Sequence, residues 1–229
     1  MPDTRARPAL SELYGHTQAR VVALVVELDE AQHEAPVPAC PGWRVRDVVS
    51  HMVAVGEDVL EGRLTRPPTD EESAAQVARF ADRPVAEVLA RWRELGPQFG
   101  EAIDAFTVWP AVIDVATHEH DIRGAVGAPG ARETEVVRLG SDQLLTWLRP
   151  PVPLRIEVED ETYDLGPEGA GAGAGDAAIV LRTGRFESLR WRMGRRSRTQ
   201  LAGLDWAGDP APVLDHLVVF GPSPLDIAE

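Results

Sequence analysis

The chain has 229 residues, of which 44% are hydrophobic and 26% charged, enough to form one large or two small globular domains. Its formal net charge of -14 argues against a nucleic-acid partner, because phosphate binding needs clustered Lys and Arg. No apolar run reaches the roughly 18 residues of a membrane-spanning helix, and no export leader is recognisable. We therefore expect a cytoplasmic protein that binds no membrane.

The single cysteine, Cys40, excludes an intrachain disulfide and a zinc site built from several cysteines. It lies in a loop bounded by Pro38 and Pro41. We interpret it as an inert loop residue, with a catalytic thiol as the alternative. A metal site in this chain is therefore expected to use histidine and carboxylate ligands.

Apolar residues at helical spacing dominate the chain up to residue 149. They predict helices over residues 8–32, from about Trp43 onward, and over 84–99, 109–126 and 132–148. The stretch 69–82 is interpreted as a short acidic helix or an irregular excursion. Proline clusters separate several of these segments, and Pro110 suits the first turn of its helix.

The pattern changes after Pro151. Alternating residues predict strands over 154–158 and 179–182, and the Gly- and Ala-rich stretch 166–175 predicts a flexible hairpin connection between them. Residues 186–193 are typical of a helix, and 213–219 of a helical turn or strand. The sequence thus predicts an α+β protein with a helical domain over 1–149 and a small α+β domain over 151–229.

One predicted helix carries two candidate metal ligands on the same face. Asp114 and His118 are four residues apart, so their side chains differ by only about 40° in direction around the helix. A third ligand has to come from another helix, and His51 lies among core-facing residues of the second one. Two histidines and one carboxylate leave one zinc position open, as in catalytic sites. Asp47 and Asp121, each within one turn of a candidate histidine, are expected to orient these ligands.

Each of these residues also has a simpler interpretation. An Asp and a His one turn apart are common on helices, and a single buried histidine is often only a hydrogen-bonded core residue. His and carboxylate ligands are suited to zinc, but also to nickel, iron or manganese.

Three stretches resemble the actinobacterial family of mycothiol-dependent maleylpyruvate isomerases. The first runs from Pro41-Gly-Trp to His51, and the second covers 114–127. The third combines 194–200 with Trp206-Ala-Gly-Asp-Pro and Phe220-Gly-Pro.

The resemblance implies a DinB-like four-helix bundle followed by a small sterol-carrier-like α/β domain. It also implies a zinc ion, or another divalent metal, held by His51, Asp114 and His118, and mycothiol as the thiol cosubstrate. Asp114 stands where the isomerase carries Glu, so this chain's ligand is one methylene shorter. The family also uses an arginine from its C-terminal domain, for which this chain offers the candidates Arg190, Arg195, Arg196 and Arg198. Arginine is well shaped to hold a carboxylate, although each of the four also suits a structural ion pair.

Three functions remain open at this level. The first is a metal-dependent thiol enzyme that isomerises, or transfers sulfur to, a small electrophilic substrate. The second is a non-catalytic metal-binding or regulatory protein on the same fold. The third is a metal-dependent hydrolase, because water and a thiol compete for the same open position.

Overall fold

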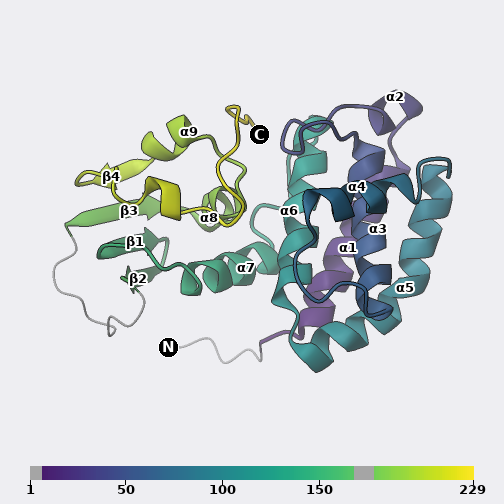
Figure 1. The fold of residues 1–229 in the computed structure, drawn as a ribbon, viewed down its shortest axis with the longest axis horizontal. Helices are drawn as coiled ribbons and strands as arrows, with labels where there is room; N and C mark the ends of the chain where they lie inside the picture. The colour runs from purple at the N-terminus through teal and green to yellow at the C-terminus, as the bar shows by residue number, and fades with distance from the viewer. Residues whose placement is uncertain (1–6, 168–177) are drawn as a thin grey trace. The chain divides into compact units, whose positions relative to one another are not determined.

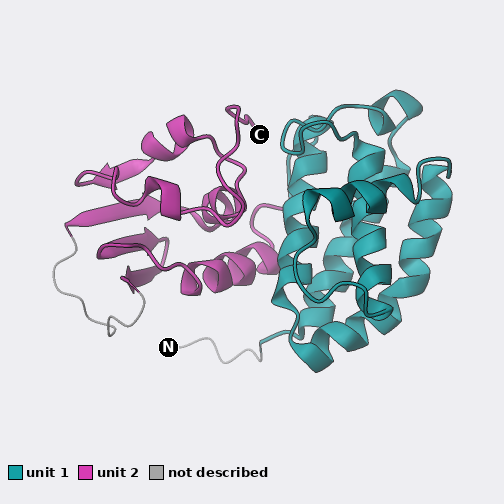
Figure 2. Ribbon diagram, in the orientation of Figure 1, with its two compact units in different colours: residues 1–130 teal, residues 131–229 magenta. Residues whose placement is uncertain are grey.

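The computed structural model describes residues 7–167 and 178–229. The chain forms two compact units, and the division between them along the sequence lies between Gly130 and Ala131 (Figure 2). The predicted boundary at residues 149–151 differs from this one. The reason is that helix α7 (Glu135–Thr146) packs against helix α8 (Arg185–Arg192), and so belongs by its contacts to the second unit.

The first unit is built around a four-helix bundle (Figure 1). Its helices are α1 (Leu10–Val26), α3 (Val45–Leu60), α5 (Val85–Phe106) and α6 (Trp109–Ala125). α1 and α3 each pack against both α5 and α6. The buried faces follow the helical spacing of apolar residues, as in α3, where Val45, Val48, Val49 and Val53 are fully buried.

Two helix bounds differ from the predicted ones. The predicted helix 8–32 is interrupted after Val26, and a short helix α2 (Glu30–His33) follows. Asp29 causes the restart, because its carboxylate accepts a hydrogen bond from the Gln32 amide and so caps α2. α5 continues beyond the predicted end at 99, since Phe99 and Ile103 extend its buried face by a further turn. The acidic stretch forms α4 (Asp70–Ala78), capped by Thr69.

The second unit contains a four-stranded sheet with strand order β2-β1-β3-β4. The strands are β1 (Leu154–Val158), β2 (Glu161–Leu165), β3 (Ile179–Thr183) and β4 (Asp205–Ala207). Alternate residues of β1 and β3 enter a core that also contains Trp191 of α8. The remaining elements are α9 (Arg198–Ala202) and the 3-10 turn η1 (Leu214–His216).

The predicted hairpin between the first and second predicted strands is wrong. β1 turns back directly into β2, which was not predicted, whereas β1 and β3 pair in parallel. The short turn has the non-glycine residue Glu159 at a φ of 51°, a conformation that gives little local sequence signal. Most of the predicted Gly-rich connection lies outside the described residues. The predicted α+β class with a helical N-terminal part is confirmed.

Among the described residues, none of the helices combines the length and apolar character needed to cross a bilayer.

Candidate metal centre

Helix α6 places two candidate carboxylates, Asp114 and Asp121, beside the imidazole of His118. His118 Nε2 lies 3.4 Å from Asp114 Oδ1, and His118 Nδ1 lies 2.9 Å from Asp121 Oδ2. The spacing of four residues on one side and three on the other produces this arrangement, because both carboxylates fall one turn from the histidine. His118 and Asp121 are buried, whereas the Asp114 side chain is 30% exposed. The Nε2 of His118 therefore lies beside the partly exposed carboxylate of Asp114, and its Nδ1 lies beside the buried carboxylate of Asp121.

Helix α3 contributes His51 to the same cluster. The His51 and His118 rings are 5.2 Å apart, with an edge-to-face orientation. One ligand atom from each of His51, Asp114 and His118 lies within 4.8 Å of the others. The structure therefore brings together the three residues that were predicted as metal ligands.

The spacing of these donors is compatible with zinc. At bond lengths of about 2.0–2.2 Å, tetrahedral geometry places neighbouring nitrogen and oxygen ligands roughly 3.3–3.6 Å apart. The separation of 3.4 Å between His118 Nε2 and Asp114 Oδ1 falls in that range. The shorter side chain of Asp114 thus lies at ligand spacing from His118.

The loop before α3 covers this cluster with an aromatic ring. Trp43 lies 5.0 Å from the His51 ring and 6.5 Å from the His118 ring, measured between centroids. Backbone hydrogen bonds from Trp43 to Cys40 and from Val37 to Trp43 close the loop. Gly42 takes a φ of 85°, which glycine adopts without strain. Trp43 packs against both rings and thereby restricts their rotation.

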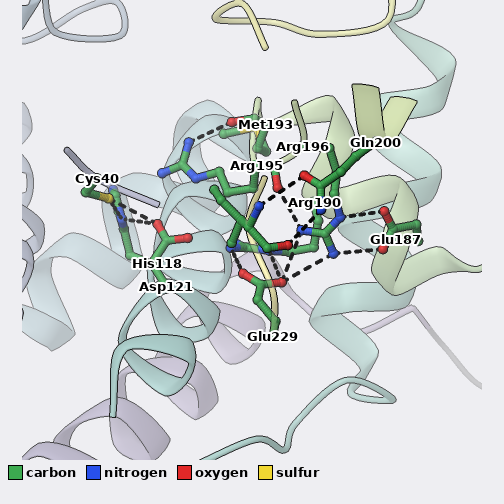
Figure 3. A network of polar contacts seen from close by, with 11 residues as sticks. Cys40, His118, Asp121, Glu187, Arg190, Met193, Arg195, Arg196, Gln200 and Glu229 are labelled. Carbon is green, nitrogen blue, oxygen red and sulfur yellow. Dashed lines mark hydrogen bonds and ion pairs between the residues drawn. The ribbon is translucent and has the colours of Figure 1, made fainter. Parts of the chain in front are cut away.

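The same loop brings Cys40 to the other side of His118. Its Sγ donates to Asp121 Oδ2 at 3.4 Å and lies 3.9 Å from His118 Nδ1 (Figure 3). Cys40 therefore lies beside a candidate ligand, although its interpretation as an inert loop residue stays a prediction. The partners of Cys40 on α6 are about 80 positions away, so no local pattern indicated this contact. Its position three residues before Trp43 was the only sequence signal for it.

The electrostatic environment of His118 favours its protonated form. Burial disfavours the charged imidazole, but the charge and hydrogen bond of Asp114, with hydrogen bonds of Asp121 and Cys40, raise the pKa of His118 well above its ordinary value. In this arrangement each ring nitrogen faces a carboxylate oxygen, which can only accept a hydrogen. A metal ion at Nε2 has to displace one of these protons.

Asp47 has well-defined partners of its own. Its carboxylate accepts hydrogen bonds from the backbone N–H and the guanidinium of Arg44, which closes the first turn of α3. Burial opposes ionisation, but these bonds lower the pKa of Asp47. Its expected role in orienting His51 stays a prediction.

The candidate arginines of the second unit have different environments. Arg190 is fully buried and is paired with Glu229, and Arg196 binds Glu187 and also approaches Glu229 (Figure 3). Arg195 donates to the Met193 carbonyl. Arg198 forms an exposed pair with Asp215. The structure thus places Arg190 and Arg196 together at one carboxylate, and Arg198 at the surface.

Comparisons with known proteins agree with this architecture. Residues 14–138, more than half of the chain, match the mycothiol maleylpyruvate isomerase N-terminal domain. A crystal structure of the mycothiol-dependent maleylpyruvate isomerase superimposes with a TM-score of 0.56 at 14% identity, over 81% of this chain and 88% of that one. A mutant of that isomerase, with a histidine replaced by alanine, gives the same TM-score and coverage at 13% identity. At this identity, the likeness establishes a common fold.

Among curated protein sequences, none matches the chain significantly. The domain match covers α3, α5, α6 and all but the first turn of α1, and it includes every residue of the His51, Asp114 and His118 cluster. The chain therefore belongs to the family defined by the mycothiol maleylpyruvate isomerase N-terminal domain.

Proposed function

We propose that this protein is a metal-dependent thiol enzyme that uses mycothiol in the isomerisation of, or sulfur transfer to, a small electrophilic substrate. The proposed metal is zinc, or another divalent ion, held by His51, Asp114 and His118. The single observation that carries the proposal is the convergence of these three side chains from α3 and α6, with one ligand atom of each within 4.8 Å of the others and the His118–Asp114 pair at the 3.4 Å spacing of zinc ligands. Family membership supports the isomerase class and mycothiol as cosubstrate.

The open coordination position is what the proposed chemistry requires. A bound zinc ion would supply a Lewis-acid position at which a thiol loses its proton at neutral pH. With zinc bound, Asp121 would accept the Nδ1 hydrogen of His118, which leaves the Nε2 lone pair for the ion beside Asp114. Trp43 holds the two imidazole rings in place from one side. These residues bind and orient; none of them needs to act as the nucleophile.

For a substrate carboxylate, Arg190 and Arg196 are the stronger of the four arginine candidates. Both are buried and already bind carboxylates within the second unit, so a substrate carboxylate would have to take the place of Glu229 or Glu187. A guanidinium in such surroundings forms strong paired hydrogen bonds. Arg198 is less suitable, because its exposed pair with Asp215 is screened by water.

The direct test is a thiol titration on zinc-loaded protein. We expect the pKa of added mycothiol to fall by at least about one unit from the ordinary thiol value near 8.5. Ultraviolet absorbance of the thiolate measures this shift. A Cys40→Ser background removes the chain's only thiol, so that the signal comes from mycothiol alone.

The matched control is His51→Ala in the same Cys40→Ser background, which should leave the mycothiol pKa unchanged. If the zinc-loaded protein binds its ion but does not shift the thiol pKa, the proposed thiol enzyme is ruled out. Such a result would favour a hydrolase or a non-catalytic metal protein.

The raised pKa of His118 predicts an unusual pH dependence of zinc binding. An ordinary histidine is neutral above about pH 6.5, so an ordinary site would gain little affinity at higher pH. Because the pKa of His118 is raised, the ring is still protonated above pH 6.5, and zinc has to displace that proton there as well. We therefore expect zinc affinity to keep rising above pH 6.5, by up to about tenfold per pH unit for one displaced proton.

Calorimetry in buffers of different ionisation enthalpy measures the protons released on zinc binding. Asp121→Asn removes one of the carboxylates that favour protonated His118, so it should move the rise in affinity toward lower pH. A zinc affinity that is flat from pH 6.5 upward in the unchanged protein would contradict the prediction.

A further inference from the structure

A second cluster of ligand atoms lies on the opposite side of the His118 ring from Asp114. It consists of Cys40 Sγ, His118 Nδ1 and Asp121 Oδ2, all within 4.8 Å of one another. The pairwise separations are 3.9 Å from sulfur to nitrogen, 3.4 Å from sulfur to oxygen and 2.9 Å from nitrogen to oxygen. Asp121 and His118 are buried, and Cys40 is half-buried at the edge of the cluster.

These separations match a tetrahedral ion bound through sulfur, nitrogen and oxygen. With bonds of about 2.3 Å to sulfur and 2.0–2.2 Å to nitrogen and oxygen, neighbouring ligand atoms lie roughly 3.3–3.7 Å apart. The sulfur–oxygen separation of 3.4 Å lies within this range, the sulfur–nitrogen separation of 3.9 Å lies above it and the nitrogen–oxygen separation of 2.9 Å lies below it, so shifts of a few tenths of an ångström would satisfy all three. The donors come from two elements, the loop before α3 and helix α6, and point toward one another (Figure 3).

We propose that Cys40, His118 and Asp121 form a second metal position, which contains a thiolate and takes a thiophilic divalent ion. Cysteine sulfur is a soft ligand, so this position favours a soft ion such as Cd²⁺ over Mg²⁺ or Ca²⁺, whereas the nitrogen and oxygen donors of the first position suit zinc. The site of the proposed function has no protein sulfur, so the two positions differ in chemistry. On binding, the Cys40 thiol and His118 Nδ1 each lose a proton to solvent, and Asp121 exchanges two accepted hydrogen bonds for a bond to the ion.

The two positions compete for one histidine. A neutral imidazole has a single nitrogen lone pair available for a metal. When Nδ1 binds an ion beside Cys40, Nε2 carries the hydrogen and donates it toward Asp114 Oδ1, 3.4 Å away. His118 is then lost as a ligand to the His51 position. A thiophilic ion beside Cys40 therefore excludes a metal from the other side of the ring, and one ion binds per chain.

The test is a titration of the full chain with Cd²⁺ in the absence of added thiols. Cadmium bound to a thiolate gives a charge-transfer absorption in the ultraviolet, and Cys40 is the chain's only sulfhydryl. We expect this band in the unchanged protein, saturating at one equivalent of Cd²⁺. It should be lost in Cys40→Ser and in His118→Ala. Circular dichroism checks that both variants are folded.

His51→Ala separates this proposal from the proposed function. It removes a ligand of the first position and none of the second, so the cadmium–thiolate band should persist with unchanged intensity. Alkylation of Cys40 by iodoacetamide provides a second measurement, and Cd²⁺ should slow it in both the unchanged protein and His51→Ala. Cadmium binding without the band, or unslowed alkylation of Cys40 at saturating Cd²⁺, would overturn the second position.

Discussion

Replacing His118 by alanine is expected to weaken zinc binding by more than about 100-fold, because loss of a direct ligand should exceed the 10–100-fold effect of an outer-shell residue. His118 presents Nε2 to Asp114 and is held by Asp121 at Nδ1, so the substitution removes the imidazole that links the two carboxylates. The loss of metal should also remove any shift in the pKa of added mycothiol. Calorimetry and metal analysis after dialysis measure the effect.

The control for this substitution is His16→Ala, an exposed histidine on α1. It should bind zinc as tightly as the unchanged protein. If His118→Ala also retains full affinity while remaining folded, the zinc site lies elsewhere in the chain, and the proposed ligand set is wrong.

Replacing Glu119 by alanine should destabilise the first unit by about 2–4 kcal/mol, somewhat below the value for a fully buried pair. The Glu119 side chain is completely buried and accepts hydrogen bonds from Arg20 of α1 and Arg123 of α6. Without Glu119, the guanidinium groups of Arg20 and Arg123 lose the carboxylate that balances their charge. The cost is reduced because Arg20 is 28% exposed and Arg123 17% exposed, so that water can solvate them in part.

Urea unfolding followed by circular dichroism measures this change in the free energy of unfolding. Glu94→Ala is the matched control, because Glu94 forms an exposed pair with Arg91 at 3.5 Å. Its removal should cost less than about 0.5 kcal/mol. Similar losses for the two variants would show that the buried network contributes no more than a surface pair.

Because Glu119 follows His118 directly on α6, its loss is also expected to lower zinc affinity by loosening that helix.

Much of the first unit could be predicted from local patterns. The apolar spacing identified the bundle helices, since a helix buries one face regardless of which neighbour covers it. The pairing of Asp114 with His118 also followed from spacing, because residues four apart share a helix face wherever that helix packs. The single cysteine also indicated that a metal site would depend on histidine and carboxylate ligands.

The second unit was less accessible to such reasoning. β4 and α9 are three and five residues long, too short for a clear period, and β2 buries none of its five residues, whereas the predicted strands β1 and β3 bury alternate ones. The parallel pairing of β1 and β3 depends on where the chain returns after β2, which no residue of either strand encodes. The burial of Arg190 and Arg196 against Glu229 likewise joins positions more than thirty residues apart.

The sequence by itself determined the α+β class, the helical first part and the pairing of Asp114 with His118 as candidate ligands on α6. Only the tertiary structure decided that Cys40 lies against His118 and Asp121, and that His118 therefore has potential ligands on both sides of its ring. The physical reason is the range of the interactions. Spacing on a helix is a local property, whereas the approach of the Cys40 loop to α6 depends on how α3 and α6 pack together.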